Sequence, residues 1–128
     1  MNRHISLGIA MLAGAAIGAG AVGGLRAQSK PKAYLVTEIE VIDAAAQAVY
    51  APLVQAAIKA AGGHNFFTAG GKTVAFTGEA PKVVAISEFD SLEQVQAYRN
   101  SAAFKNLAPQ RDKAQKQVRS YAVESTAN

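Results

Sequence analysis

The side chain best suited to acid–base chemistry in this chain is His64. With an unperturbed pKa of about 6.5, an imidazole can act as a general acid or base, and it can also bind haem or a metal ion. The other histidine, His4, lies near the start, and the chain has no cysteine. Because metal sites need several such ligands at defined spacings, the sequence predicts no metal site and no cofactor, and it favours an edge-strand position for His64.

Three glutamates lie in segments with the composition of strands: Glu38, Glu40 and Glu88. Two carboxylates in one cleft can shift each other's pKa and transfer protons. Carboxylates are equally common on exposed sheet positions, where each meets water or a basic side chain. We favour the exposed or ion-paired arrangement, and we retain Glu88, with His64 and Arg111, as a candidate catalytic residue.

Two arginines could bind an anion. Arg99 follows Tyr98 at the predicted C-terminus of a helix, where the helix dipole by itself accounts for a cation. Arg111 comes shortly after Pro109, and it could bind a ligand carboxylate or pair with a glutamate of its own or a second subunit, which is the arrangement we favour. Aromatic side chains could line an apolar pocket between helices and sheet. The candidate ligand-binding residues are therefore Tyr34, Phe66, Tyr98 and Arg99.

Length and charge limit the classes of function. With 128 residues the chain has room for one domain, and its formal net charge is +4. Removal of a leader containing Arg3 and Arg26 would halve that charge, which is too small to indicate nucleic-acid binding. The turn at Gly70–Gly71 lacks the spacing and the following helix of a phosphate-binding loop. The sequence therefore predicts neither a nucleic-acid partner nor a nucleotide site.

Residues 1–27 have the layout of a secretory signal peptide. Arg3 and His4 form a short basic start, the segment from Ile5 to Val22 carries no charge, and Ala27 offers a small residue for cleavage. This predicts a periplasmic or secreted protein without stable membrane association after cleavage. The alternative is an uncleaved anchor, because the apolar segment is just long enough to span a bilayer. We expect residues 28–32 to form a linker, 33–124 a domain and 125–128 a frayed tail.

Alternating side chains and capping residues define the elements that carry these groups. We expect strands at Tyr34–Val41, His64–Thr68, Lys72–Thr77, Lys82–Phe89 and Val118–Glu124, the second and third being joined as a hairpin. One helix is expected from Asp43 to Ala61, with an interruption at Pro52. Shorter helices are expected after the caps Ser91 and Ser101, the last of them restarting at Pro109 and continuing to Lys116.

These elements predict an α+β fold with the ferredoxin-like order β-α-β-β-α-β and one extra short helix. One antiparallel sheet would carry helices on one face. On the other face we expect an apolar surface too large to remain in water in a domain of this size, with the members Tyr34, Val36, Val83, Ala85, Phe89 and Tyr121. Two subunits are therefore expected to pack sheet against sheet as a homodimer.

Several segments resemble those of the DUF1330 family of small ferredoxin-like proteins: Ala60–Gly63, Gly70–Thr73, Phe89–Gln94, Asn100–Ser101 and Pro109–Lys113. The resemblance covers residues 33–124 and extends to the exported members. It implies a dimeric α/β-barrel, an architecture shared with cofactor-free monooxygenases, haem-degrading enzymes, small isomerases and ligand-sensing modules. The family has no established biochemical role, so the resemblance assigns no catalytic residue to this chain. Many members carry an arginine before the paired glycines, where this chain has Phe67–Ala69.

We predict a homodimeric small-molecule-binding protein whose cleft lies between the sheet and the helices of each subunit. The chain shows no nucleophile paired with a base, which favours binding over catalysis. A second hypothesis is a cofactor-independent oxygenase or isomerase that uses His64, Glu88 or Arg111, and it requires at least two of them to converge in one cleft. A third is a structural or interaction protein that acts only through its dimer surface.

Overall fold

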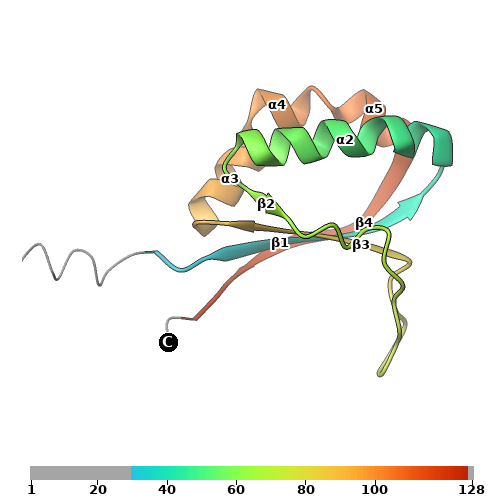
Figure 1. Ribbon diagram of the computed structural model, residues 1–128, viewed down its shortest axis with the longest axis horizontal. Helices are drawn as coiled ribbons and strands as arrows, with labels where there is room; N and C mark the ends of the chain where they lie inside the picture. Colours follow the sequence, from blue (N-terminus) through green and yellow to red (C-terminus); the bar gives the residue numbers. More distant parts are fainter. Residues whose placement is uncertain (1–29, 127–128) are drawn as a thin grey trace, which may run out of the picture. The chain divides into compact units, whose positions relative to one another are not determined.

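The computed structural model describes residues 30–126, which are built on one four-stranded antiparallel sheet (Figure 1). Its strands are β1 (Ala33–Val41), β2 (His64–Asn65), β3 (Val83–Phe89) and β4 (Gln115–Glu124), in the order β2-β3-β1-β4. With one helix between β1 and β2 and three between β3 and β4, the predicted α+β class and element order are confirmed. The predicted signal peptide and the first two residues of the predicted linker lie outside the described residues.

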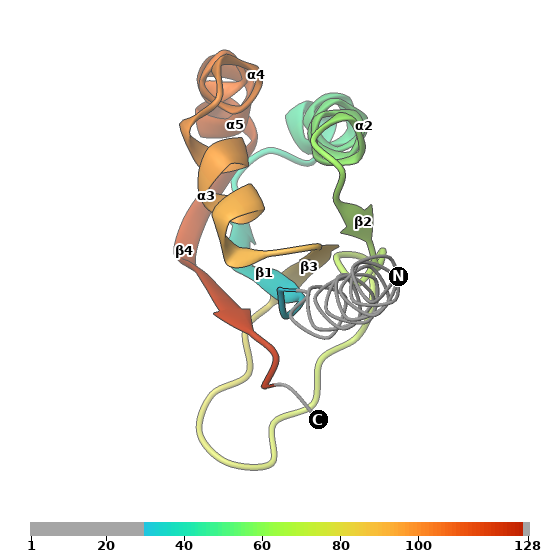
Figure 2. The same ribbon diagram turned by 90° about the vertical axis from the view of Figure 1, so that its left-hand side faces the viewer.

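All the helices in this part of the chain cover the same face of the sheet (Figure 2). They are α2 (Ala44–Ala60), α3 (Leu92–Asn100), α4 (Ala102–Lys105) and α5 (Ala108–Ala114). Figure 2 shows α2 above β2, and α3 to α5 above β4, so the two groups of helices flank the middle of the sheet. Between residues 30 and 126, no helix combines the length and the apolar character needed to cross a bilayer.

Helix α2 starts where the sequence predicts, but it is not interrupted. Asp43 caps it, because the Asp43 carboxylate accepts a 2.9 Å hydrogen bond from the backbone N–H of Ala46. The helix then runs through Pro52 to Ala60, so the expected break near Tyr50 is wrong. Proline removes only the hydrogen bond to the carbonyl of residue 48, and Ala48 is exposed, so water can hydrate that carbonyl. Gly62, with φ of 86°, ends the helix in the left-handed conformation.

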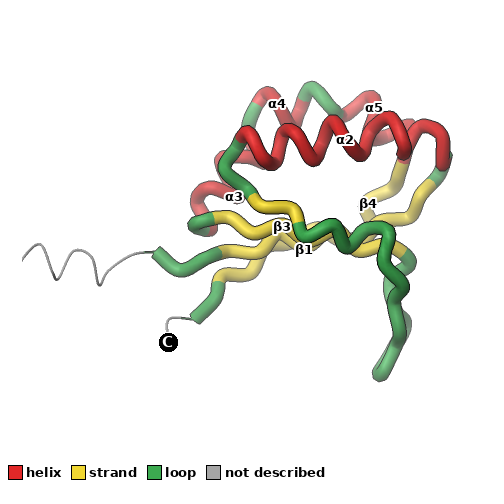
Figure 3. The backbone as a smooth tube through the Cα atoms, in the orientation of Figure 1, coloured by secondary structure: helices red, strands yellow, loops and turns green. Residues whose placement is uncertain are grey.

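The segment between β2 and β3 forms an exposed arm instead of the predicted hairpin. Strand β2 stops at Asn65 and pairs with β3, and residues 72–77 form no strand. Figure 3 shows the arm as a loop that projects from the sheet on the side opposite the helices. Val74 and Phe76 in this arm are 72% and 96% exposed. An isolated two-stranded hairpin is marginally stable, and none of the elements between residues 30 and 126 forms a second layer over the arm.

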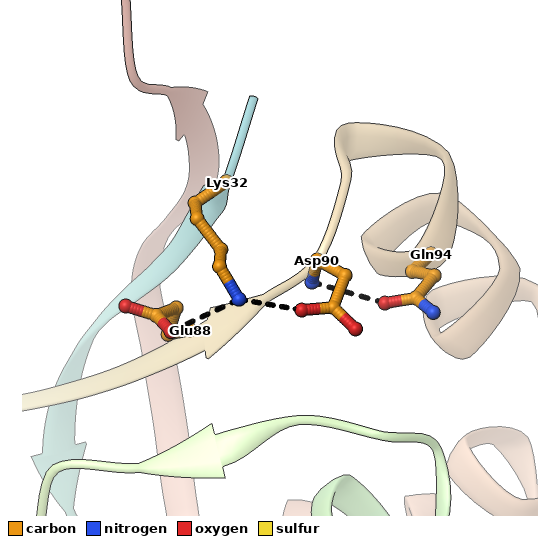
Figure 4. Close-up of polar contacts among 4 residues, drawn as sticks. All are labelled: Lys32, Glu88, Asp90 and Gln94. Carbon is orange, nitrogen blue, oxygen red and sulfur yellow. Dashed lines mark hydrogen bonds and ion pairs between the residues drawn. The ribbon is translucent and has the colours of Figure 1, made fainter. Parts of the chain in front are cut away.

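The caps of the shorter helices agree with the sequence. Ser91 accepts a 3.2 Å hydrogen bond from the backbone N–H of Gln94, and the Gln94 side chain accepts one of 3.0 Å from the backbone N–H of Asp90 (Figure 4). Ser101 caps α4 in the same way. Helix α5 restarts with Pro109 in its first turn, as predicted, but it ends at Ala114 and the last strand begins at Gln115 rather than Val118.

The core lies between the helices and the sheet, and β3 faces it differently from our expectation. Directly opposed residues of antiparallel strands share a face, and Phe89 lies opposite Ala33 of the core. Phe89 is 1% exposed and packs against Tyr98. Assigning Val83, Ala85 and Phe89 to the outer face was therefore wrong, because alternation alone cannot tell one face from the other. The outer positions of β3 are Val84, Ile86 and Glu88.

Candidate functional site

A cavity of about 90 Å³ lies between the sheet and the helices, which is room for about three water molecules at the ~30 Å³ that each occupies in the liquid. The sizes of the side chains on the strands explain why the cavity forms. On the helix-facing side, Leu35, Ile39 and Phe89 are large, but Thr37, Ala85 and Ser87 between them are small. The space that these short side chains leave is closed by α2 and α3, which contribute Tyr50, Val54, Ile58 and Tyr98.

Some polar groups around the cavity satisfy one another. Thr37 and Ser120 share a 3.0 Å hydrogen bond between their hydroxyls across β1 and β4. Ser87 donates a 3.2 Å hydrogen bond to the Asn65 side-chain carbonyl, and the Asn65 amide donates to the backbone carbonyl of Gln55. These bonds hold the polar side chains on the sheet side of the cavity in place, and they connect β2 to α2.

Three other polar atoms are buried without a hydrogen-bond partner among residues 30–126: Gln47 Oε1, Gln115 Oε1 and the Tyr98 hydroxyl. All three residues line the cavity. A buried polar atom without a partner costs about 1–3 kcal/mol, and such atoms are rare in folded proteins. Three polar atoms that the fold itself leaves without partners therefore belong to residues around one hollow.

Two arginines share one aromatic ring beside the cavity. The guanidinium carbons of Arg99 and Arg111 lie 4.2 and 4.0 Å from the centroid of Phe104. Arg111 donates from Nε to the Tyr50 hydroxyl at 3.2 Å and from an Nη to the Phe104 carbonyl at 2.7 Å. Arg99 donates to the Ser120 hydroxyl at 3.3 Å. Within the described part of the chain neither guanidinium forms a salt bridge, so Arg111 has no glutamate partner there.

The electrostatics of this cluster follow from burial and like charge. Burial lowers the pKa of Arg99, and the positive charge of Arg111 lowers it further. Arg99 nevertheless stays protonated at neutral pH. Burial, together with the Tyr50 hydroxyl, raises the pKa of Tyr98 to about 12. Tyr98 is therefore a neutral hydroxyl donor throughout the physiological pH range.

The predicted ligand-binding residues separate onto two faces of the sheet. Tyr98 and Arg99 line the cavity, as the sequence hypothesis requires. Tyr34 and Phe66 stack on the outer face, with ring centroids 6.4 Å apart. His64 lies beside them, edge-to-face with Phe66 at 5.2 Å, and its side chain is exposed.

The three catalytic candidates do not form one cluster. His64 and Glu88 are cross-strand partners on the outer face, whereas Arg111 lies in the helical layer on the other side of the sheet. The Glu88 carboxylate is 3.7 Å from the ammonium of Lys32, which also binds Asp90 at 2.6 Å (Figure 4). Lys32 accordingly has a raised pKa, chiefly through its hydrogen bond to Asp90.

Of the exposed or ion-paired arrangements favoured for the glutamates, Glu38 and Glu88 adopt the ion-paired one. Arg119 donates two hydrogen bonds to the Glu38 carboxylate, at 2.9 and 2.7 Å, and these bonds lower the Glu38 pKa against the opposing effect of burial. Glu88 meets Lys32 as described above. No group of three histidine, cysteine or carboxylate side chains capable of holding a metal ion occurs between residues 30 and 126.

Sequence reasoning missed most of the cavity wall. Thr37 and Ser87 carried a usable signal, since each is a small polar residue on an otherwise apolar strand face. Gln47 and Gln115 gave none, because glutamine is ordinary on exposed surfaces, whereas Tyr50 is one of the aromatic side chains expected to line a pocket. Only the packing of α2 against the sheet brings Gln47 on α2 and Gln115 on β4 to the same hollow.

Comparison with known proteins gives a family and a fold. The sequence model described as "Domain of unknown function (DUF1330)" matches residues 32–126. No curated protein matches the chain. The crystal structure of RPA0582, a protein of unknown function from Rhodopseudomonas palustris, is 15% identical, with a TM-score of 0.61 over 85% of this chain and 94% of that one. Methylated RPA0582 is 14% identical, with a TM-score of 0.59 over 84% of this chain and 91% of that chain. At these identities the likeness shows the fold alone.

Proposed function

The chain belongs to the DUF1330 family, whose model spans nearly all the described residues, and on that premise we propose that this member binds a small molecule in the cavity between sheet and helices. The observation that carries the proposal is the gathering of three unpartnered buried polar atoms around one mostly apolar hollow. A ligand that supplies hydrogen-bond partners there recovers free energy that the empty fold forgoes.

The chemistry of the wall favours binding without catalysis. Of the side chains that line the cavity, only Arg99 is charged at neutral pH, and none is a histidine, a carboxylate or a cysteine. Acid–base catalysis needs a group that exchanges a proton near the working pH. His64 and Glu88, which could do so, face the opposite side of the sheet. The cavity is therefore a place to hold a molecule rather than to transform it.

A homodimer is part of the proposal. The outer face of the sheet carries exposed apolar side chains, among them Phe66, Tyr121 and Val123, and the arm with Phe76 projects on that same side. A second copy packed sheet against sheet would cover this surface and meet the arm, giving a dimeric α/β-barrel. The dimer would leave the cavity, on the helical side, within each subunit.

The dimer can be tested with two exposed valines on opposite sides of the molecule. Val123→Glu on the outer face should shift the protein from dimer to monomer in sedimentation velocity. Val49→Glu, on α2 and 62% exposed, adds the same charge away from the sheet and should leave the dimer intact. A monomeric parent protein, or equal behaviour of both variants, would refute the sheet-to-sheet dimer.

We also propose that the protein is exported to the periplasm or secreted. The support is the basic start, uncharged segment and small residues of the first 27 residues. Fractionation of cells and N-terminal sequencing of the protein would show either a shortened chain outside the cytoplasm or an intact one retained in the cell.

Small-molecule binding is tested by closing the cavity. NMR titration with benzyl alcohol should shift resonances of the cavity wall in the parent protein. Ala85→Leu places a larger side chain in the hollow and should abolish those shifts while the protein stays folded. Val84→Leu, one residue away on the outer face, should change nothing. Unchanged binding by the Ala85 variant would overturn the proposed site.

A further inference from the structure

The cavity wall carries a positive charge that has no counter-charge. Arg99 is the cavity-lining cation, and Arg111 adds a second one over the same Phe104 ring. In the chain from residue 30 to 126 no carboxylate forms a salt bridge with either. Two like charges in a partly desolvated place repel each other, so an anion bound beside them is favoured more than a neutral molecule.

The two arginines differ in how many donors remain. Arg111 is held on both sides, by the Tyr50 hydroxyl and the Phe104 carbonyl, and it therefore acts as a brace between α2, α4 and α5. Arg99 makes one hydrogen bond, from one Nη to Ser120 at 3.3 Å. A guanidinium has five N–H donors in a planar fork, so most donors of Arg99 have no acceptor within the described chain. That fork matches the geometry of a carboxylate.

Tyr98 adds a second donor of the right kind. Its ring packs among Phe89 and Phe104, its hydroxyl is buried without a partner, and it lines the same cavity as Arg99. With its pKa raised to about 12, the hydroxyl is protonated at neutral pH, as an ordinary tyrosine is, and it can donate a hydrogen bond. A phenol beside a guanidinium is suited to an acceptor-only group, and an ionised carboxylate is such a group.

Apolar side chains form a large part of the remaining wall. Leu35, Val54, Ile58 and Ala85 are among them, beside polar residues such as Thr37 and Gln55. We propose that the ligand is a small carboxylic acid. The hollow of about 90 Å³ is smaller than the ~150 Å³ cavity that binds benzene, so a molecule the size of benzoate lies partly outside it. Its carboxylate binds Arg99 and Tyr98, and its apolar body lies over β1 and β3. The inference rests on the proposed small-molecule site and names the chemical class that this site selects.

Titration of the intact protein with three probes, followed by calorimetry or NMR, tests the carboxylate preference and the apolar contact separately. Benzoate has the carboxylate and an apolar ring, benzamide is nearly isosteric but neutral, and acetate has the carboxylate without the ring. We expect benzoate to bind at least tenfold more tightly than either of the others. Benzamide equal to benzoate would overturn carboxylate selection and leave the binding site itself intact. Equal affinity for acetate and benzoate would mean that the site binds only the carboxylate group, and this would overturn the proposal.

Substitutions test which residues cause the preference for benzoate over benzamide. Arg99→Gln should bring benzoate binding down to the benzamide level, and Tyr98→Phe should weaken benzoate several-fold with little effect on benzamide. Lys113→Gln removes the same charge from an exposed position on α5 and should keep the preference. A benzoate preference that survives in the Arg99 variant would overturn this assignment. Failure of all three probes to bind the parent protein would overturn the proposed function together with this inference.

Discussion

Arg99 and Arg111 lie over one aromatic ring, that of Phe104, with their guanidinium carbons 4.2 and 4.0 Å from its centroid. The ring, with its negative face, partly offsets the cost of holding two cations close together. The two arginines have different roles in this arrangement. Arg111 braces the helices, while Arg99 faces the cavity with most of its donors free of protein acceptors in the described chain.

Because Arg111 connects α2, α4 and α5, its replacement is predicted to lower the stability of the fold. Arg111→Met keeps the long apolar stem but removes the hydrogen bonds to Tyr50 and to the Phe104 carbonyl. We expect a loss of about 1–3 kcal/mol in the free energy of unfolding, because hydrogen bonds from a charged group are worth more than neutral ones. Urea unfolding measures it. Lys113→Met on the same helix, which is exposed, should change stability by less than about 0.5 kcal/mol; equal effects would contradict the brace.

Gly63 is predicted to admit no side chain. An added Cβ would lie 2.6 Å from Ile58 Cγ2 and 2.8 Å from Phe89 Cζ, so the core must shift to accommodate it. Gly63→Ala should lower the free energy of unfolding by about 1–3 kcal/mol. Gly70→Ala is the matched control, since nothing lies within 4 Å of its Cβ position. A Gly63 variant as stable as the control would show that this packing is looser than described.

Tyr98 predicts a dependence of stability on alkaline pH. Its folded pKa is about 12, above the ordinary value of 10.0. The native state therefore holds the phenol proton more tightly, so the stabilisation is complete below about pH 10 and is lost as pH rises toward 12. Tyr98→Phe should flatten the fall in unfolding free energy over that window. An unchanged fall in the Tyr98 variant would contradict the assignment.

Replacement of Phe67 is predicted to affect stability and ligand binding in different directions. It lines the cavity with φ of 56°, in the left-handed region that a phenylalanine rarely adopts, and its side chain is 73% exposed. Phe67→Asn suits that backbone better, so thermal stability should be unchanged or slightly higher. Loss of the ring should weaken binding of an apolar probe several-fold. A destabilised variant with unchanged affinity would mean that the ring serves folding alone.

Local signals predicted the elements of the fold well. Asp43, Ser91 and Ser101 each cap a helix in the structure, because a cap depends on a few neighbouring residues. Long-range choices were harder. Which face of β3 meets the helices depends on its register with β1. The expected strand at residues 72–77 is absent, and among residues 30–126 no second layer covers this segment.

The site was predictable only in part for the same reason. Tyr98 and Arg99 were identified as ligand candidates from the sequence, and both line the cavity. His64 and Glu88 attracted attention through their chemistry, but strand pairing places them on the outer face. Gln47 and Gln115 are far apart in the sequence and reach the hollow only through tertiary packing, so no local pattern could have selected them.

The central claim is that the hollow between sheet and helices holds a ligand rather than water. A crystal structure of the protein soaked with benzoate tests it most directly. We expect density for benzoate in the cavity, with its carboxylate at Arg99 and the Tyr98 hydroxyl. Ordered waters bridging Gln47, Gln115 and Tyr98, with benzoate absent or bound elsewhere, would contradict it.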